Sequence, residues 1–526
     1  MTTVERPVSA FLTILGPTSH GAVFLLSIER DMSTKNLSLR KSLAFSFAQR
    51  YTTFAFSLVS IIIVSRLLTP KEIGIFSVAI GLTTLANILR TFGVSDYLVQ
   101  EKHLTESMIR TSFTVNLIFA WTLALVLFGV SWQIGHFFHE AGVGEVVRVL
   151  SISFALVPFG ITAMALLKRE MAFGSLYKIN AISSVSGSCM TVVLAYAGFG
   201  YMSMAWSSVA AMVIMVTACA VWGREYRVRG LSLSGWRRIL PFGAKMTISD
   251  IAAQLGEQSA NVVIGKMLGM ADAGIFSRGY GPVNMFREKV VLAIQAVAYP
   301  ALAAEHRESG TAPRLFLRAL VYVTGISWPF FAFAALMALP MIRLMFGDQW
   351  DAAVPLMRWL CGAAIIGSLI YHCNSFFVAV GRVGAGTMIE IQYQSVRLAL
   401  AIVAAFYSVE AVAASQVPVY LIATALYYRA MHEFPQLAFA KCARALAPSA
   451  AVTVTTCLVP AAVAGWPGLL ETHLLLGFAI AVLGAGAGWI LGAFAVSHPL
   501  LAEMRRVAPG LRAAFAGVWN KRRRAV

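Results

Sequence analysis

The chain has 526 residues, of which 58% are hydrophobic and only 13% are charged. A soluble domain of average composition carries about 25% charged residues, so this composition excludes an ordinary soluble protein and indicates an integral membrane protein. The formal net charge of +18 would suggest nucleic-acid binding in a soluble chain, but basic loops beside anionic lipid explain it in a membrane protein.

The apolar segments are about 20 residues long, which is typical of membrane-spanning helices and not of the roughly ten-residue alternating strands of an outer-membrane barrel. We expect an all-α polytopic membrane protein of about 14 transmembrane helices, with two pseudo-symmetric six-helix bundles and two further helices at the carboxyl end. The expected spans are 42–65, 73–94, 111–136, 146–167, 176–197, 201–222, 242–266, 274–300, 315–346, 353–379, 387–408, 411–430, 445–465 and 471–496.

These spans divide the chain into six parts. They are a cytoplasmic leader at 1–41, an amino-terminal bundle at 42–222, a basic linker at 223–240, a carboxyl-terminal bundle at 241–430, two additional helices at 431–496 and a basic tail at 497–526.

The first 31 residues lack a small-residue cleavage site. Met32 opens a sequence typical of a natural start, so we expect that translation begins there or that 1–31 is disordered. A short surface helix is the alternative.

Lys and Arg residues concentrate in alternate loops, including the linker and the tail. The loops on the opposite side hold only Arg66, Lys71, Lys266 and Arg343. By the positive-inside rule, both termini are expected on the cytoplasmic side of a bacterial inner membrane. The tail could also be an amphipathic helix on anionic lipid, although a solvated basic tail is the simpler interpretation.

A stretch near the first apolar segment occurs twice in the chain. RLLTPKEIGIFS begins at Arg66 and KMLGMADAGIFS begins at Lys266, so matching residues stand 200 positions apart without a gap. A repeat of this kind indicates two structurally similar halves. Because the repeat is parallel, the expected symmetry axis runs along the membrane normal.

Four motifs together carry a family resemblance. The pattern [RK]-[LM]-L-x-x-x-[ED]-x-G-I-F at Arg66 is followed by L-x-Q-E-K-x-L from Leu98 to Leu104, by LLKREM at 166–171 with Phe173, and by Gly198-Phe199-Gly200. In this order they resemble the polysaccharide-exporter branch of the MOP superfamily, which holds the Wzx-type flippases. The resemblance covers roughly Ser42 to the late 490s.

The resemblance implies a transporter and not an enzyme. Its expected activity is to move a polyprenyl-diphosphate-linked oligosaccharide across the inner membrane by alternating access, for exopolysaccharide, capsule or O-antigen assembly. The resemblance implies membrane lipids, a glycan polymerase and export machinery as partners, and it does not imply nucleic acid. Two rivals stay open, a cation-coupled multidrug exporter of the same superfamily and a membrane glycan polymerase or ligase.

Ionisable residues inside apolar spans are costly and therefore suggest function. This sequence has several, which are Arg50, Arg90, Asp250, Glu257, Arg278, Arg287, Glu288, Lys289, Arg358, Glu390 and Arg397. Our hypothesis is that Arg50, Arg90 and Arg287 face one hydrated cavity between the halves and bind the diphosphate, because guanidinium groups match phosphate oxygens. Related flippases place arginines in the first, second and eighth spans, which the resemblance carries to these three positions.

The acidic residues Asp250 and Glu257 would hold these arginines, together with Arg278, or would bind a coupling proton or sodium ion. The alternative is a pair of structural bridges, Glu257 with Arg278 and Asp250 with Arg287, since these pairs match in expected depth.

The motif search gives no sign of a cofactor. The chain has no GxxxxGK[ST] sequence for ATP, and we expect no metal. No long loop carries the paired acids expected of a glycan polymerase or ligase.

Overall fold

The computed structural model describes residues 39–91, 97–99, 101, 103–226, 228, 230–236, 254–291, 294, 302, 304–306 and 312–502. Within these ranges the side chains of 39–51, 88–91 and 467 are excluded. All regular secondary structure in the described ranges is helical, as the sequence predicts.

The first half of the chain contributes six long helices and one short one. They are α3 (Leu39–Leu67), α4 (Pro70–Thr91), α6 (Glu106–Phe138), α7 (Ala141–Leu156), α8 (Pro158–Arg169), α9 (Phe173–Tyr196) and α10 (Met202–Trp222), followed by the 3-10 turn η1 (Arg224–Tyr226). The single span expected at 146–167 is instead two helices, α7 and α8, which meet at a bend of 52°. Pro158 at the start of α8 causes the break, because its ring and missing N–H interrupt the helical hydrogen bonds.

The second half begins, within the described ranges, with the helical residues 254–267. It continues with α12 (Met270–Phe286), the π-helical turn η2 (Arg287–Val291), α14 (Ala312–Leu336), α15 (Ala338–Phe346), η3 (Asp348–Trp350), α16 (Ala353–Gly367), α17 (Cys373–Ala379), α18 (Val383–Ala405), α19 (Val409–Ala430), η4 (Pro435–Leu437), α20 (Phe439–Ala464), α21 (Pro467–Thr472) and α22 (Leu474–Ala495). Two expected spans are again interrupted, 315–346 at Met337 and 353–379 at 368–372.

Seven of the described helices are long and apolar enough to cross a membrane, and the count reaches eight if the bent pair α7–α8 is one span. They are α6, α9, α10, α14, α19, α20 and α22. Long exposed apolar side chains on α22, such as Leu475, Leu483 and Leu491 at 72%, 74% and 68% exposure, are what a lipid-facing helix presents. The chain is therefore a multi-pass membrane protein of helices, and the total of fourteen spans stays a prediction.

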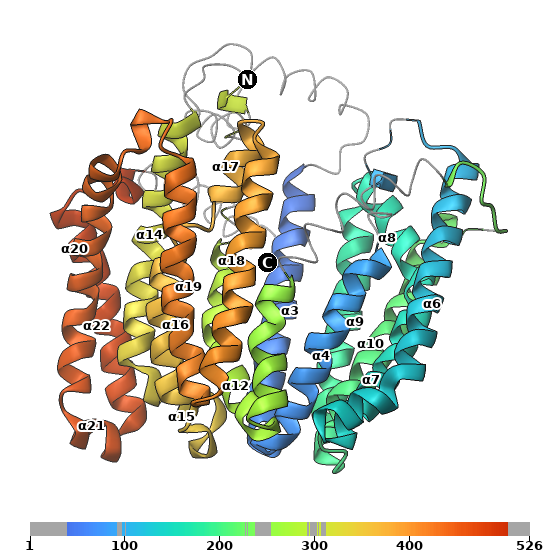
Figure 1. Cartoon of the computed structure of the whole chain (residues 1–526), viewed down its shortest axis with the longest axis horizontal. Coiled ribbons are helices and arrows are strands. Elements are labelled where there is room, and N and C mark those ends of the chain that lie inside the picture. Colours follow the sequence, from blue (N-terminus) through green and yellow to red (C-terminus); the bar gives the residue numbers. More distant parts are fainter. Residues whose placement is uncertain are drawn as a thin grey trace, which may run out of the picture.

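The described helices gather in two groups that lie side by side (Figure 1). The group on the right of Figure 1 contains α4 and α6–α10, and the group on the left contains α14–α22, with α3 and α12 between them. Within the groups α6 packs on α7, α9 on α10, α16 on α19 and α14 on α20, whereas α4 packs against α12 across the junction.

The repeated stretches meet at this junction. A Cβ added at Gly74 would lie 1.6 Å from the Met270 carbonyl oxygen, and a Cβ added at Gly274 would lie 1.9 Å from the Pro70 carbonyl oxygen. The two hairpins therefore approach each other closely at these glycines. Only glycine fits such a contact. Beyond the junction, the buried Trp350 donates its indole N–H to the Ser65 carbonyl oxygen at 2.8 Å, which ties the carboxyl-terminal group to the end of α3.

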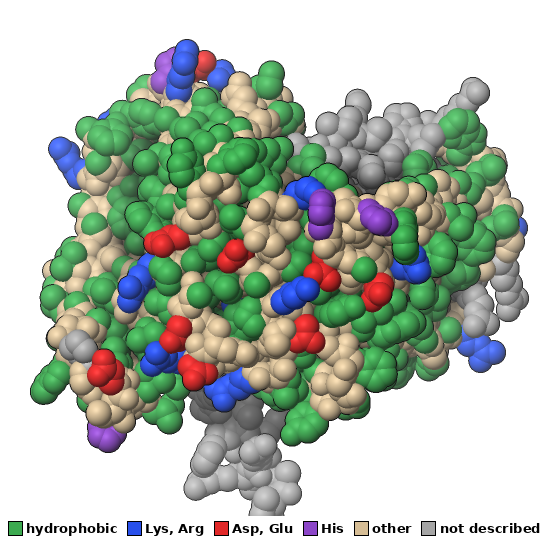
Figure 2. Space-filling model, turned by 60° about the horizontal axis from the view of Figure 1, so that its bottom comes forward, with side chains coloured by type: hydrophobic (Ala, Val, Ile, Leu, Met, Phe, Trp, Pro, Cys, Tyr) green, Lys and Arg blue, Asp and Glu red, His purple; other side chains and the backbone are tan. Residues whose placement is uncertain are grey.

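The bottom face of the molecule mixes acidic and basic side chains near its centre (Figure 2). Ion pairs join helices at this end, including Lys71 with Glu140 at 2.7 Å and Arg343 with Asp351 at 2.6 Å. Arg343 and Asp351 are about one-third exposed, so their interaction contributes little to stability after solvent screening.

Candidate functional site

A cavity of about 940 Å³ lies between the two groups of helices. Side chains of α3, α4, α9 and α10 line it from the amino-terminal half, and side chains of 254–267, α12, η2 and α15 line it from the other half. Its volume lies near the upper end of the range for ligand pockets, which commonly measure roughly 300–1,000 Å³, so it can hold a large organic ligand.

Hydroxyl groups dominate the amino-terminal side of the cavity. We call this surface the hydroxyl wall, and it comprises Ser57, Ser60, Ser184, Ser188, Thr191 and Ser208. Several of these groups donate their proton to a backbone carbonyl, as Thr191 does to Gly187 at 2.9 Å and Ser208 to Met204 at 2.8 Å. A hydroxyl satisfied in this way keeps acceptor lone pairs for a ligand that brings its own donors.

Charged groups line the opposite side of the cavity. The described lining residues from the carboxyl-terminal half include Glu257, Arg278, Glu288 and Lys289, together with amides. The carboxylate of Glu288 accepts a hydrogen bond from Asn284 Nδ2 at 3.0 Å. The ammonium of Lys289 lies 5.8 Å from the ring centre of Phe54 on α3, so it reaches across to the amino-terminal half.

Arg287 and Glu257 form an ion pair at the edge of the cavity. The guanidinium of Arg287 also donates to Asn284 Oδ1, from Nε at 3.2 Å and from Nη2 at 2.9 Å. Arg287 begins the π-helical turn η2, and such a turn shifts the following side chains around the helix and often marks a functional site. Both side chains of the pair are 24% exposed. Glu257 lines the main cavity, whereas Arg287 lines a smaller pocket beside it.

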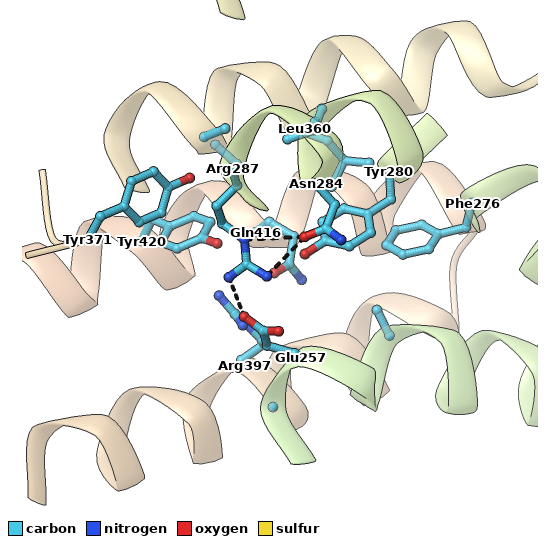
Figure 3. Close-up of a pocket in the computed structure, with 15 residues that line it drawn as sticks. Glu257, Phe276, Tyr280, Asn284, Arg287, Leu360, Tyr371, Arg397, Gln416 and Tyr420 are labelled. Carbon is cyan, nitrogen blue, oxygen red and sulfur yellow. Dashed lines mark hydrogen bonds and ion pairs between the residues drawn. The ribbon is translucent and has the colours of Figure 1, made fainter. Parts of the chain in front are cut away.

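A second, much smaller pocket of about 30 Å³ lies behind this ion pair. Figure 3 shows Arg287 and Glu257 above and below it, with Arg397, Gln416 and aromatic side chains close by. Glu257, Tyr280 and Asn284 line both spaces. The small pocket is thus a recess next to the main cavity, inside the carboxyl-terminal group.

Comparison with known proteins identifies the chain's family. Residues 63–355, more than half of the chain, match the family described as polysaccharide biosynthesis protein. The chain belongs to this family. Among curated relatives, it is 27% identical over 355 residues to the succinoglycan biosynthesis transport protein ExoT of Rhizobium meliloti, a match that covers 67% of this chain and 71% of ExoT. It is 23% identical over 328 residues to the lipopolysaccharide biosynthesis protein WzxC of Escherichia coli, covering 62% of this chain and 67% of WzxC.

Solved structures share the fold of this polysaccharide biosynthesis protein. The lipid II flippase MurJ in an inward closed conformation aligns with a TM-score of 0.70 at 10% identity, over 86% of this chain and 99% of MurJ. A multidrug resistance MATE transporter of the MOP superfamily, in its inward-facing conformation, aligns with a TM-score of 0.59 at 16% identity, over 72% and 95% of the two chains. The suspected family is confirmed, and the named activities among these proteins are transport and flipping, not enzymatic reactions, as expected.

Only part of the expected site of this family member can be located. Arg50 and Arg90 lie on α3 and α4, but their side chains are outside the described residues, and Asp250 is outside them entirely. Arg50 precedes the cavity-lining Thr53 by one helical turn. The convergence of Arg50, Arg90 and Arg287 on the cavity therefore stays a prediction.

The alternative pairing of Glu257 with Arg278 is wrong. The structure pairs Glu257 with Arg287, while the guanidinium of Arg278 lies over the rings of Phe346 and Trp350, 5.6 Å from each centre. Equal depth in a hairpin does not specify which face of the helix a side chain occupies. Nine residues are about two and a half helical turns, so Arg278 and Arg287 point to opposite sides of the helix and only one can meet Glu257.

The hydroxyl wall and the role of Arg397 were not assigned from the sequence. Ser184, Ser188 and Thr191 stand at spacings of four and three, which places them on one face of α9 and could have indicated the wall. Among the described residues, no three His, Cys, Asp or Glu side chains come together as metal ligands.

Proposed function

We propose that the protein is a flippase that moves a polyprenyl-diphosphate-linked oligosaccharide from the cytoplasmic to the periplasmic leaflet of the inner membrane. The observation that carries the proposal is the cavity of about 940 Å³, with the hydroxyl wall on one side and charged side chains on the other. A glycan needs many polar partners, and a diphosphate needs cationic ones. Membership of the polysaccharide biosynthesis family and the names of ExoT and WzxC support a glycan substrate.

The two sides of the cavity would bind different parts of the substrate. The glycan would lie against the hydroxyl wall, whose free lone pairs accept hydrogen bonds from sugar hydroxyls. The diphosphate would lie near Arg287 and Lys289, with Arg50 and Arg90 as further expected contacts and Asp250, Glu257 and Arg278 as supporting groups. When the diphosphate arrives, it competes with Glu257 for the Arg287 guanidinium, because both offer anionic oxygens.

The proposed architecture has fourteen spans, arranged as pseudo-symmetric bundles at 42–222 and 241–430 and two further helices at 431–496. Both termini would be cytoplasmic, and rocking of the two halves about their junction would expose the cavity to each side in turn. Likeness to MurJ and to a MATE transporter, which share the fold at TM-scores of 0.70 and 0.59, supports this arrangement. A proton or sodium gradient could drive the cycle, and a glycan polymerase and export machinery would receive the product.

A multidrug exporter is the main rival function, because the MATE fold neighbour is one. Such a protein would need a cavity for apolar cations. The described cavity favours a polar substrate, since many hydroxyls and amides line it. Its described charges are two basic and two acidic side chains, those of Arg278, Lys289, Glu257 and Glu288, so the preference for an anion depends on the expected contributions of Arg287, Arg50 and Arg90.

The test is flipping of a lipid-linked oligosaccharide in proteoliposomes that contain the wild-type protein, Arg287→Gln or the control Arg314→Gln. Arg314 is an exposed arginine in the first turn of α14. Losing a hydrogen bond to a charged group costs about 1.5–3 kcal/mol, so we expect roughly a tenfold slower rate for Arg287→Gln and an unchanged rate for the control. All proteins must first show equal insertion and must be fully folded at the assay temperature.

A second variant keeps the test decisive if Arg287→Gln does not fold. Lys289→Gln removes a cavity charge that forms no ion pair among the described residues, and we expect it to slow flipping while it leaves folding intact. Equal rates for all folded variants would refute the assignment of the diphosphate to this side of the cavity. If the wild type moved no lipid-linked glycan under any gradient, the flippase proposal itself would be wrong.

A further inference from the structure

Arg397 is a buried cation in the interior of the carboxyl-terminal group. Its residue is only 6% exposed, and its guanidinium lies between two aromatic rings, 5.1 Å from the centre of Tyr420 and 5.6 Å from that of Tyr393. Its Nε is buried without a hydrogen-bond acceptor. Cation–π contacts alone offset only part of the cost of removing a guanidinium from water.

No described carboxylate forms an ion pair with Arg397. Glu257, which lies near it in Figure 3, is paired with Arg287. Glu390 is the one acidic residue on α18, the helix of Arg397. Its carboxylate accepts hydrogen bonds from Tyr393 at 2.7 Å, from Gln394 at 3.0 Å and from Tyr427 at 3.2 Å. The group of Glu257, Arg287 and Arg397 therefore carries one net positive charge, which is unfavourable in a membrane interior without a counter-ion.

The small pocket lies next to this excess charge. Its polar lining is rich in donors, because the guanidinium of Arg397, the amide of Gln416 and the phenol groups of Tyr280, Tyr371 and Tyr420 surround it (Figure 3). The Nε2 atom of Gln416, a residue only 7% exposed, also has no acceptor. Two buried donors without acceptors thus face one enclosed space.

We propose that this pocket binds a small monovalent anion, with chloride as the physiological ligand. The volume of about 30 Å³ exceeds the roughly 10–15 Å³ that one water needs, and it is too small for a phosphate group. The sign of the ligand follows from the net positive charge and from the unpaired donors on Arg397 and Gln416. A metal cation would meet like charge and, among the described residues, no unpaired carboxylate in the pocket.

Access to the anion site is through the main cavity. Glu257, Tyr280 and Asn284 line both spaces, so a hydrated halide would enter past the Glu257–Arg287 pair. Glu257 does not oppose binding strongly, because Arg287 already neutralises its carboxylate. The bound anion would hold together 254–267, α12, α18 and α19, and this stabilising role does not depend on which substrate the protein transports.

The experiment is thermal unfolding of the purified full-length protein in detergent, with sodium chloride replacing sodium gluconate at constant ionic strength. We expect the melting temperature to rise by a few degrees with chloride and to saturate, and bromide to act similarly. In Arg397→Gln the response should disappear. The matched control is Arg278→Gln, which removes another arginine whose Nε is buried without an acceptor. Arg278 does not line the small pocket, so this variant should keep the halide response.

Direct location of the ion makes the test independent of how Arg397→Gln folds. Crystals of the wild-type protein grown in bromide should give an anomalous peak between Arg397 and Gln416. A further variant, Gln416→Leu, should weaken the halide response several-fold. Identical melting in chloride and gluconate, or an empty anomalous map at the pocket, would mean that it holds water only and would overturn the proposal.

Discussion

Ser77 Oγ donates a hydrogen bond to Ser277 Oγ at 3.0 Å, although the two residues are 200 positions apart in the chain. They are equivalent positions of the repeated stretch, so the repeat meets itself at the junction of the two helix groups. Two further contacts flank this point and mirror each other. Arg66 donates to the Leu344 carbonyl oxygen at 2.7 Å, and its repeat equivalent Lys266 donates to that of Phe137.

The two serines provide a test of whether this junction opens during transport. In a protein whose six native cysteines are replaced, Ser77→Cys and Ser277→Cys together should form a disulfide under mild oxidation, because the hydroxyl oxygens already lie within 3.0 Å. If alternating access separates the halves here, oxidation should stop flipping and a reductant should restore it. Each single variant, treated in the same way, is the control. Full activity of the cross-linked protein, with the bond verified by mass spectrometry, would show that the junction stays closed.

Gly74 offers a second test of the same contact. An added Cβ would lie 1.6 Å from the Met270 carbonyl oxygen, so Gly74→Ala should push the two hairpins apart and destabilise the protein by about 1–3 kcal/mol. Gly129 on α6 is the matched control, since nothing lies within 4 Å of its added Cβ. There the better helix propensity of Ala should stabilise the protein by up to about 1 kcal/mol. Thermal unfolding of both variants measures the difference, and equal melting temperatures would contradict the close approach.

The sequence predicts the helices well because the length of an apolar run is a local property. It predicts their breaks poorly. The interruption at Met337 and the turn at 368–372 lie inside apolar runs, where packing decides whether a helix continues. The bend before Pro158 was in principle visible, since proline cannot continue the hydrogen bonds of the preceding turn.

The sequence indicates which charged residues lie inside apolar runs, but it does not indicate which of them contact each other. A charge in an apolar run is conspicuous, which is why the sequence draws attention to Glu257 and Arg287. The structure joins them in an ion pair that lines the small pocket, and their role in binding stays a prediction. Their pairing depended on helix faces and on the π-helical turn at Arg287, and neither follows from depth. Serine and threonine gave little signal, because hydroxyls that donate to their own helix, as Ser208 does to Met204, are ordinary in membrane helices.

Arg382 and Glu433 predict a small pH dependence of stability. The Arg382 guanidinium donates to the Glu433 carboxylate, and this hydrogen bond lowers the pKa of Glu433 below its usual value. Because the pKa is lower in the folded state than in the unfolded state, the stabilisation is complete above the unfolded pKa of about 4.3. It is lost as pH falls through the folded pKa.

The measurement compares melting temperatures of the wild type and Arg382→Gln between pH 7 and acidic pH. We expect a small gap, since the pair is exposed, that closes as the pH falls below about 4 and shrinks with added salt. Lys441→Gln is the control, because Lys441 donates to the Pro435 carbonyl oxygen, a group that does not titrate. A gap for Arg382→Gln that widens in acid would contradict the assignment.

Glu257 and Arg287 predict strongly non-additive effects on stability. Removing one partner of a buried pair leaves an uncompensated charge and costs about 3–5 kcal/mol. Because each side chain is 24% exposed, we expect Glu257→Gln and Arg287→Gln each to lie near the lower end of that range. The double variant should be more stable than the sum of the two single effects predicts, because it leaves neither charge unpaired. Thermal unfolding of all four proteins gives the coupling energy, and simple additivity would mean that water in the cavity screens the pair.

Arg397 should make the two single variants unequal in stability, since in Arg287→Gln the freed Glu257 carboxylate has a second guanidinium nearby. We therefore expect Arg287→Gln to be less destabilising than Glu257→Gln, which leaves two unpaired arginines.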